Sequence, residues 1–146
     1  MNNEGSWEDC LESSNAIAIS SNRKKARSLV NTAKGRNMYL GRNKMDEVSA
    51  NYIFEGYYNS VIELVHSLAL LHGFKVLNHL CLGHFLREVI KDEQLYRLFD
   101  DCRYKRNSLV YYGTAMEFLV AKEAIEKCKR LIAQLLALYE KKDKTS

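Results

Sequence analysis

The sequence contains no proline among its 146 residues. Proline breaks helices more strongly than any other residue, because it lacks a backbone N–H and its ring clashes with the preceding turn. Helices in this chain can therefore run long. The apolar residues are mainly leucine, alanine and tyrosine rather than valine and isoleucine, a mixture that favours helices over strands. These features predict an all-α fold.

Apolar side chains recur at steps of three and four residues, which is the spacing of one helix face. This pattern predicts about five helices. In the segment 14–38 the helical pattern is clearest over residues 22–38. The expected helices span approximately residues 22–38, 46–72, 76–90, 93–112 and 115–140.

Glycines and capping residues separate these segments. Gly41, Gly73 and Gly113 are expected to end helices, because glycine readily adopts the left-handed conformation found at helix C-termini. Short polar side chains that accept hydrogen bonds from the first turn of a helix are expected as N-caps. These residues are Asp46, Asp92 and Thr114, the last in a capping box with Glu117.

Short connections between helices favour antiparallel neighbours. We therefore expect an up-and-down antiparallel helical bundle over residues 14–141. Residues 1–13 are polar and are expected to be partly disordered, and residues 142–146 form a basic tail.

The sequence shows neither a signal peptide at its start nor an apolar run of the roughly 18 residues that a membrane-spanning helix needs. We therefore expect no membrane association. Its four cysteines are far apart and form no C-x-x-C motif. In a chain with these properties we expect reduced thiols that pack as small apolar side chains, and a cytoplasmic location. The cysteines are Cys10, Cys81, Cys102 and Cys128.

The net charge is +4, and the positive residues are unevenly distributed. Residues 13–45 contain no aspartate or glutamate. Such a segment has either a solvated basic helix face or a surface that faces phosphate groups, and composition leaves both interpretations open. Its basic residues are Arg23, Lys24, Lys25, Arg27, Lys34, Arg36, Arg42 and Lys44.

Common catalytic and cofactor motifs do not occur. The sequence lacks glycine-rich phosphate loops and a serine nucleophile elbow. The spacing His79-x-Cys81-x-x-His84 matches no common zinc pattern and lacks a second ligand cluster. We therefore expect neither a metal nor a cofactor.

The segment 103–113 holds the most informative polar pattern. In a helix, Arg103, Asn107 and Tyr111 lie on one stripe, and Arg106 flanks it. Arginine binds phosphate bidentately, an amide can orient it or contact a base, and a tyrosine offers a hydrogen bond and a stacking ring. These residues, with Tyr112, are candidate ligands of a nucleotide or RNA. The alternative is an exposed helix face on which one tyrosine packs against a neighbouring helix.

This segment resembles the signature of the HEPN superfamily of small helical proteins. The family motif is arginine, usually followed by a polar residue such as asparagine, then four to six residues and a histidine; Arg106-Asn107 is similar to its first part. The tyrosine-rich segment 50–60, the segment 68–75 ending its helix near Gly73, and Asn78-His79 also resemble small prokaryotic members. The likeness covers about residues 22–138.

The resemblance implies an up-and-down bundle that forms a homodimer, with the two arginine motifs facing a shared cleft. Many members are metal-independent ribonucleases, often toxins paired with a nucleotidyltransferase antitoxin, and others bind nucleotides or recruit substrates. Glu55 and Asn59, on one stripe with Glu63, are expected to line the same cleft. Their alternative position is the outer helix face.

The sequence departs from the family at the motif histidine, where Tyr111 and Tyr112 stand instead. A tyrosine, with an ordinary pKa of about 10, is a poorer acid or base at neutral pH than histidine. The departure favours binding over catalysis. Any activity would use Arg106, Asn107 and Tyr111.

Two functions therefore stay open. The first is a nucleotide- or RNA-binding protein of HEPN type, either inactive or a weak metal-independent endoribonuclease of a toxin–antitoxin-like system. The second is a non-catalytic helical protein that pairs with a nucleotidyltransferase or another protein partner.

Overall fold

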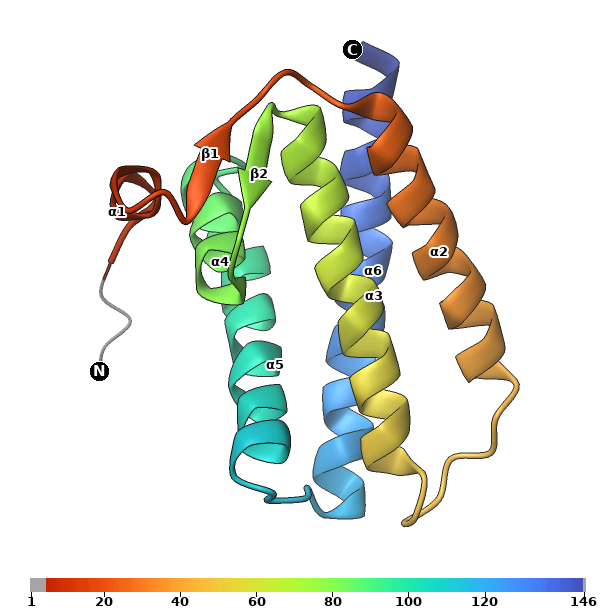
Figure 1. Cartoon of the computed structure of the whole chain (residues 1–146). Helices are drawn as coiled ribbons and strands as arrows, with labels where there is room; N and C mark the ends of the chain where they lie inside the picture. Colours follow the sequence, from red (N-terminus) through yellow and green to blue (C-terminus); the bar gives the residue numbers. More distant parts are fainter. Residues whose placement is uncertain (1–4, 146) are drawn as a thin grey trace.

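Helices dominate the structure, a computed structural model that describes residues 5–145 (Figure 1). The predicted all-α bundle is confirmed. Within the described residues the chain forms six helices and one small two-stranded sheet. In chain order the elements are α1 (Trp7–Glu12), β1 (Ala16–Ala18), α2 (Arg23–Gly41), α3 (Ala50–Leu71), β2 (Phe74–Val76), α4 (His79–Glu88), α5 (Glu93–Tyr111) and α6 (Phe118–Thr145).

The long helices run up and down, and α3 lies at the centre of the bundle (Figure 1). Helices α2 and α6 make the most extensive contacts with α3, and α5 packs against α4 and α6. Helix α3 is apolar on most sides because neighbours surround it, and its largest fully buried side chains include Phe54, Tyr58 and Leu64. Burial of such side chains is the main favourable contribution to folding.

The N-terminal region differs from our expectation. Ser6 caps α1 by accepting a hydrogen bond from the Asp9 N–H, and Trp7 and Cys10 are buried. The prediction of disorder is therefore wrong for residues 7–12, while residues 1–4 lie outside the described residues. The segment that we expected to start a helix at residue 14 instead contains β1, which pairs antiparallel with β2 and places Ala16 opposite Val76.

The fourth helix also starts later than residue 76. Residues 74–76 form β2, and Asn78 caps α4 by accepting a hydrogen bond from the Cys81 N–H at 2.8 Å. The N-terminal cap of α5 is confirmed, because the Asp92 carboxylate accepts a hydrogen bond from the Leu95 N–H at 3.0 Å.

The other two predicted caps are wrong. The Asp46 carboxylate accepts hydrogen bonds from Val48 and Ser49 in a turn that precedes α3. Helix α6 begins only at Phe118, so Thr114 does not cap it. Instead, Asn51 of α3 holds the α5–α6 connection: its amide oxygen accepts from the Met116 N–H at 2.9 Å, and its amide nitrogen donates to the Met116 carbonyl at 3.0 Å.

The predicted helix ends agree better with the structure. Helix α2 ends at Gly41, and glycines with positive φ follow α3 and α5. The last helix is longer than expected, because α6 continues to Thr145. The predicted basic tail is therefore helical over residues 142–145, and Arg23 of α2 forms an ion pair with Asp143 at 3.1 Å. Residue 146 lies outside the described residues.

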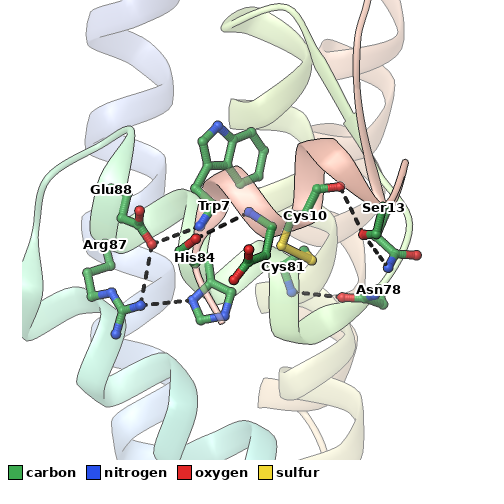
Figure 2. Close-up of a disulfide and its surroundings, with 11 residues drawn as sticks. Trp7, Cys10, Ser13, Asn78, Cys81, His84, Arg87 and Glu88 are labelled. Atoms are coloured by element: carbon green, nitrogen blue, oxygen red, sulfur yellow. Dashed lines mark hydrogen bonds and ion pairs between the residues drawn. A yellow bond between two sulfur atoms is a disulfide. The ribbon is translucent and has the colours of Figure 1, made fainter. Parts of the chain in front are cut away.

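A disulfide joins Cys10 of α1 to Cys81 of α4, with 6.0 Å between their Cα atoms (Figure 2). The prediction of reduced thiols is wrong for this pair, whose separation of 71 residues gives no sequence signal of pairing. Trp7 supports the junction, because its ring meets Phe74 and Phe85 edge-on and its backbone N–H donates to the Glu88 carboxylate at 2.9 Å.

The other two cysteines, Cys102 and Cys128, are free and buried, as expected. Within the basic segment 13–45, Arg36 forms an ion pair with Glu63 of α3, and its Nη2 lies 3.0 Å from Oε2. Most of the other basic side chains of the segment are exposed, which favours the solvated helix face. No helix within residues 5–145 is long and apolar enough to cross a membrane.

Candidate anion-binding site

A cleft of about 380 Å³ lies between the start of α4 and the C-terminal half of α5. Four residues of the polar pattern in segment 103–113 line it, and residues from around the start of α4 form its other wall. The complete lining is Leu77, Asn78, His79, Leu80, Arg103, Arg106, Asn107 and Tyr111.

The packing of α4 against α5 positions the two walls. Gly83 permits this contact, because a Cβ atom there would lie 3.3 Å from the Tyr96 ring and 3.4 Å from the Phe99 ring. Phe99 and Cys102 of α5 are buried in the core. The polar positions that follow along the helix surface, at Arg103 and Asn107, consequently face the cleft.

The two arginines in the cleft have different surroundings. Arg103 contacts Asp100 on its own helix, with Nε and Nη2 at 3.0 and 2.9 Å from Oδ1. The Arg106 guanidinium lies 5.7 Å from the ring centroids of Tyr58 and Tyr111. No carboxylate within residues 5–145 forms an ion pair with it. Arg106 therefore brings a positive charge into the cleft that no ion pair compensates.

His79 lies at the first position of α4, beside this charge. Its Nδ1 is 3.0 Å from the Tyr58 hydroxyl, and their ring centroids are 5.7 Å apart. Burial, with a smaller contribution from the charge of Arg106, lowers the pKa of His79 to about 4. Burial also raises the pKa of Tyr58 well above its ordinary value. At neutral pH the imidazole is therefore uncharged and the phenol is protonated.

The hydrogen bond to Tyr58 determines what the other imidazole nitrogen of His79 can do. If the Tyr58 hydroxyl donates to Nδ1, Nε2 carries the proton and can donate to an anion. If Nδ1 carries the proton, Nε2 is free to accept one. The same side chain can thus bind a phosphate oxygen or act as a base.

The structure brings together Arg103, Arg106, Asn107 and Tyr111, as the helical stripe predicts. Three other expected site residues are not part of the cleft lining. Tyr112 is the C-terminal cap residue of α5, and Glu55 and Asn59 lie on α3 outside the lining. The third member of their stripe, Glu63, faces α2, where it pairs with Arg36.

Sequence reasoning missed His79, which lines the cleft, and Tyr58, which contacts His79 and Arg106 from α3. His79 lies 27 positions before Arg106, and only the packing of α4 on α5 brings it to the cleft. The adjacent Asn78 was the available signal, because an asparagine is a strong N-cap and places the following residue at a helix start.

The residues of the His79-x-Cys81-x-x-His84 segment point to different partners. His79 contacts Tyr58, Cys81 is in the disulfide, and His84 Nδ1 lies 3.1 Å from Arg87. In the part of the chain that the structure describes, no cluster of three or more His, Cys, Asp or Glu side chains could hold a metal ion.

Comparison of the chain with models of known protein families, with characterised proteins and with solved structures finds no match. The likeness to the HEPN superfamily accordingly stays a prediction from the sequence.

Proposed function

We propose that this protein binds the phosphate group of RNA or of a nucleotide in the α4–α5 cleft. The observation that carries the proposal is the guanidinium of Arg106, which lines the cleft and has no carboxylate partner within residues 5–145. Arginine offers a planar set of donors that fits phosphate oxygens. Asn107 and the uncharged His79 add neutral hydrogen-bonding groups.

The size of the cleft supports a ligand larger than a simple ion. Its volume of about 380 Å³ falls in the usual range of small-molecule sites. Tyr111 at its rim offers a ring on which a base can stack. A cytoplasmic location stays part of this proposal, and the Cys10–Cys81 disulfide argues against it, because disulfides persist mainly in oxidising compartments.

A binding assay tests the proposal directly. Arg106→Ala should weaken the binding of AMP and of a labelled RNA about tenfold to a hundredfold at low salt, because it removes charged hydrogen bonds to phosphate. Arg42→Ala is the matched control, since Arg42 is an exposed arginine outside the cleft lining. Equal affinities of the parent and Arg106→Ala would overturn the proposal.

The position of His79 favours metal-independent RNA cleavage as an extension of this binding. The imidazole can accept the 2′-hydroxyl proton while the 2′-oxygen attacks phosphorus. The bond from phosphorus to the 5′-oxygen then breaks, the leaving oxygen takes a proton from solvent, and a 2′,3′-cyclic phosphate forms. Arg106 stabilises the charge on the phosphorus-bound oxygens. A bound phosphate raises the pKa of His79, bringing it nearer to the range that suits a general base.

Cleavage is tested with RNA in the presence of a chelator. His79→Gln should abolish cleavage and leave RNA binding within a few-fold of the parent, because glutamine can still donate a hydrogen bond but cannot act as a base. Cleavage that survives in His79→Gln would exclude this role. Binding without cleavage by the parent protein would restrict the function to binding.

A second candidate function is protein binding, and an exposed apolar surface favours it. Several exposed large apolar side chains belong to the end of α2, the start of α3, the start of α6 or the α2–α3 connection, and these segments lie at the lower end of the bundle in Figure 1. Such surfaces often mark protein interfaces. A nucleotidyltransferase partner and a homodimer both rest on the HEPN resemblance. Sedimentation of the protein alone and with such a partner tests them. The exposed side chains include Met38, Tyr39, Val48, Tyr52 and Leu119.

A further inference from the structure

Exposed tyrosines continue the cleft along the outside of α5. Tyr104 and Tyr111 are each 68% exposed and lie seven positions apart. Seven residues are almost two helical turns, so the two side chains share one face of α5 and lie about 10 Å apart along its axis. Asn107, which lines the cleft, is on the same face between them.

The ring of Tyr104 is not part of the hydrophobic core. Other aromatic residues of α5, such as Tyr96 and Phe99, are buried against α4 or the core. By contrast, no side-chain hydrogen bond or ring contact joins Tyr104 to another residue between 5 and 145. Its ring is therefore available to a ligand, and it stands on the helix that presents Arg103 and Arg106 to the cleft.

We propose that the cleft and Tyr104 together bind single-stranded nucleic acid, which deepens the proposed function and rests on it. A phosphate lies at Arg106, one base stacks on Tyr111, and a second base stacks on Tyr104. Leu77, which lines the opposite wall and is 52% exposed, offers an apolar surface to the first base. Stacking on tyrosine depends little on base identity, because every base has a π-face.

The spacing of the two tyrosine positions along α5 argues against a duplex. Stacked nucleotides advance about 3.4 Å along each strand, so neighbouring bases of a duplex do not match two helix positions about 10 Å apart along the axis. Paired bases also turn their faces toward each other and away from a protein ring. An unpaired strand can extend and turn its bases outward, as sequence-tolerant single-strand binders require.

The experiment compares four ligands by fluorescence anisotropy and competition in the presence of a chelator. The ligands are AMP, a twelve-nucleotide oligo-adenylate RNA, its DNA counterpart, and an RNA hairpin whose stem is fully paired. The single-stranded RNA should bind more tightly than AMP and than the hairpin. Comparison of the RNA and DNA strands tells whether the 2′-hydroxyl contributes.

Tyr104→Ala should weaken binding of the single strand about tenfold, which corresponds to one lost stacked base, and should leave AMP affinity unchanged. Tyr104→Phe should bind as the parent does, since it keeps the ring. Tyr39→Ala is the matched control, because Tyr39 is 65% exposed and lies on α2 outside the cleft lining. Both positions of change, Tyr104 and Tyr39, are at the surface, so the fold should be retained.

The outcomes separate this inference from the proposed function. Unchanged affinity of Tyr104→Ala for the single strand, or equal binding of hairpin and single strand, overturns the inference alone if Arg106→Ala still weakens AMP binding. Failure of Arg106→Ala to weaken AMP binding, or no binding by the parent protein, overturns both.

Discussion

Loss of the Cys10–Cys81 disulfide should destabilise the protein strongly. The bond closes a loop between residues 71 positions apart in the sequence, and it reduces the number of conformations open to the unfolded chain. The chain-entropy model gives about 4 kcal/mol for a loop of this length. A domain of this size loses roughly 3 °C of melting temperature per kcal/mol, so reduction should lower Tm by about 12 °C.

The assay has two parts. Thiol titration in denaturant should find two reactive thiols, Cys102 and Cys128, in the untreated protein, and four after treatment with a dithiol. Thermal and urea unfolding then compare the oxidised protein, the reduced protein and Cys10→Ser. Addition of reductant to Cys10→Ser is the matched control and should not change its unfolding midpoint.

Two results would refute the reasoning at different points. Four reactive thiols in the untreated, denatured protein would show that the bond does not form. A disulfide that forms, but whose reduction leaves Tm unchanged, would show that loop closure is not what it contributes. In that case the burial of Trp7 and its hydrogen bond to Glu88 would be sufficient to hold α1 in place.

Three further predictions follow from the core and the cleft. The pKa of His79, about 4 in the folded protein, lies below its ordinary value of about 6.5, so the unfolded chain takes up this proton first as the pH falls. The stability that the uncharged imidazole contributes is thus lost between about pH 6.5 and 4, and urea unfolding of His79→Gln should depend less on pH in that window. Gly83→Val should lower the free energy of unfolding by about 1–3 kcal/mol and weaken AMP binding, because the new side chain pushes α4 away from α5. Retained AMP binding would show that the cleft tolerates this movement. Glu63→Gln should lower the free energy of unfolding, measured in urea, by about 1–2 kcal/mol, since it breaks the partly buried ion pair with Arg36. An unchanged unfolding midpoint would count against a contribution from that ion pair.

Sequence reasoning succeeded where the signal is local. Asp92 precedes a helix whose first turn contains the N–H groups that its carboxylate binds, and Gly73 adopts the positive φ expected after a helix. The stripe on α5 was likewise predictable, because Arg103, Asn107 and Tyr111 are placed by helical periodicity alone.

Local signals failed where a second local signal competed with the first or where a tertiary contact overrode it. Asp46 and Ser49 both suit an N-cap, and the chain forms a turn at Asp46 before α3 begins at Ala50. Thr114 matches a capping box, but Asn51 binds the backbone of Met116 and delays the start of α6 to residue 118. A tertiary contact decided the second case, and no pattern within the segment contains it.

Pairings between distant segments were not predictable at all. The strand β1 is only three residues long and finds its partner some 60 positions later, at β2, so neither strand has a readable alternation. Cys10 and Cys81 carry no spacing motif. Both pairings belong to one feature, the attachment of the N-terminal segment to the region around the start of α4.

A contact between distant segments also bears on catalysis. In the segment that resembles the HEPN signature, Tyr111 and Tyr112 stand where the resemblance predicts a histidine, which argues against acid–base chemistry. In the folded chain, His79 reaches the cleft from α4, and Tyr58 lies against both His79 and Arg106. A general base needs to be near the proton that it takes, whatever its position in the sequence. The absence of a histidine near Arg106 in the sequence therefore does not by itself argue for an inactive protein, and the His79→Gln variant is the decisive comparison.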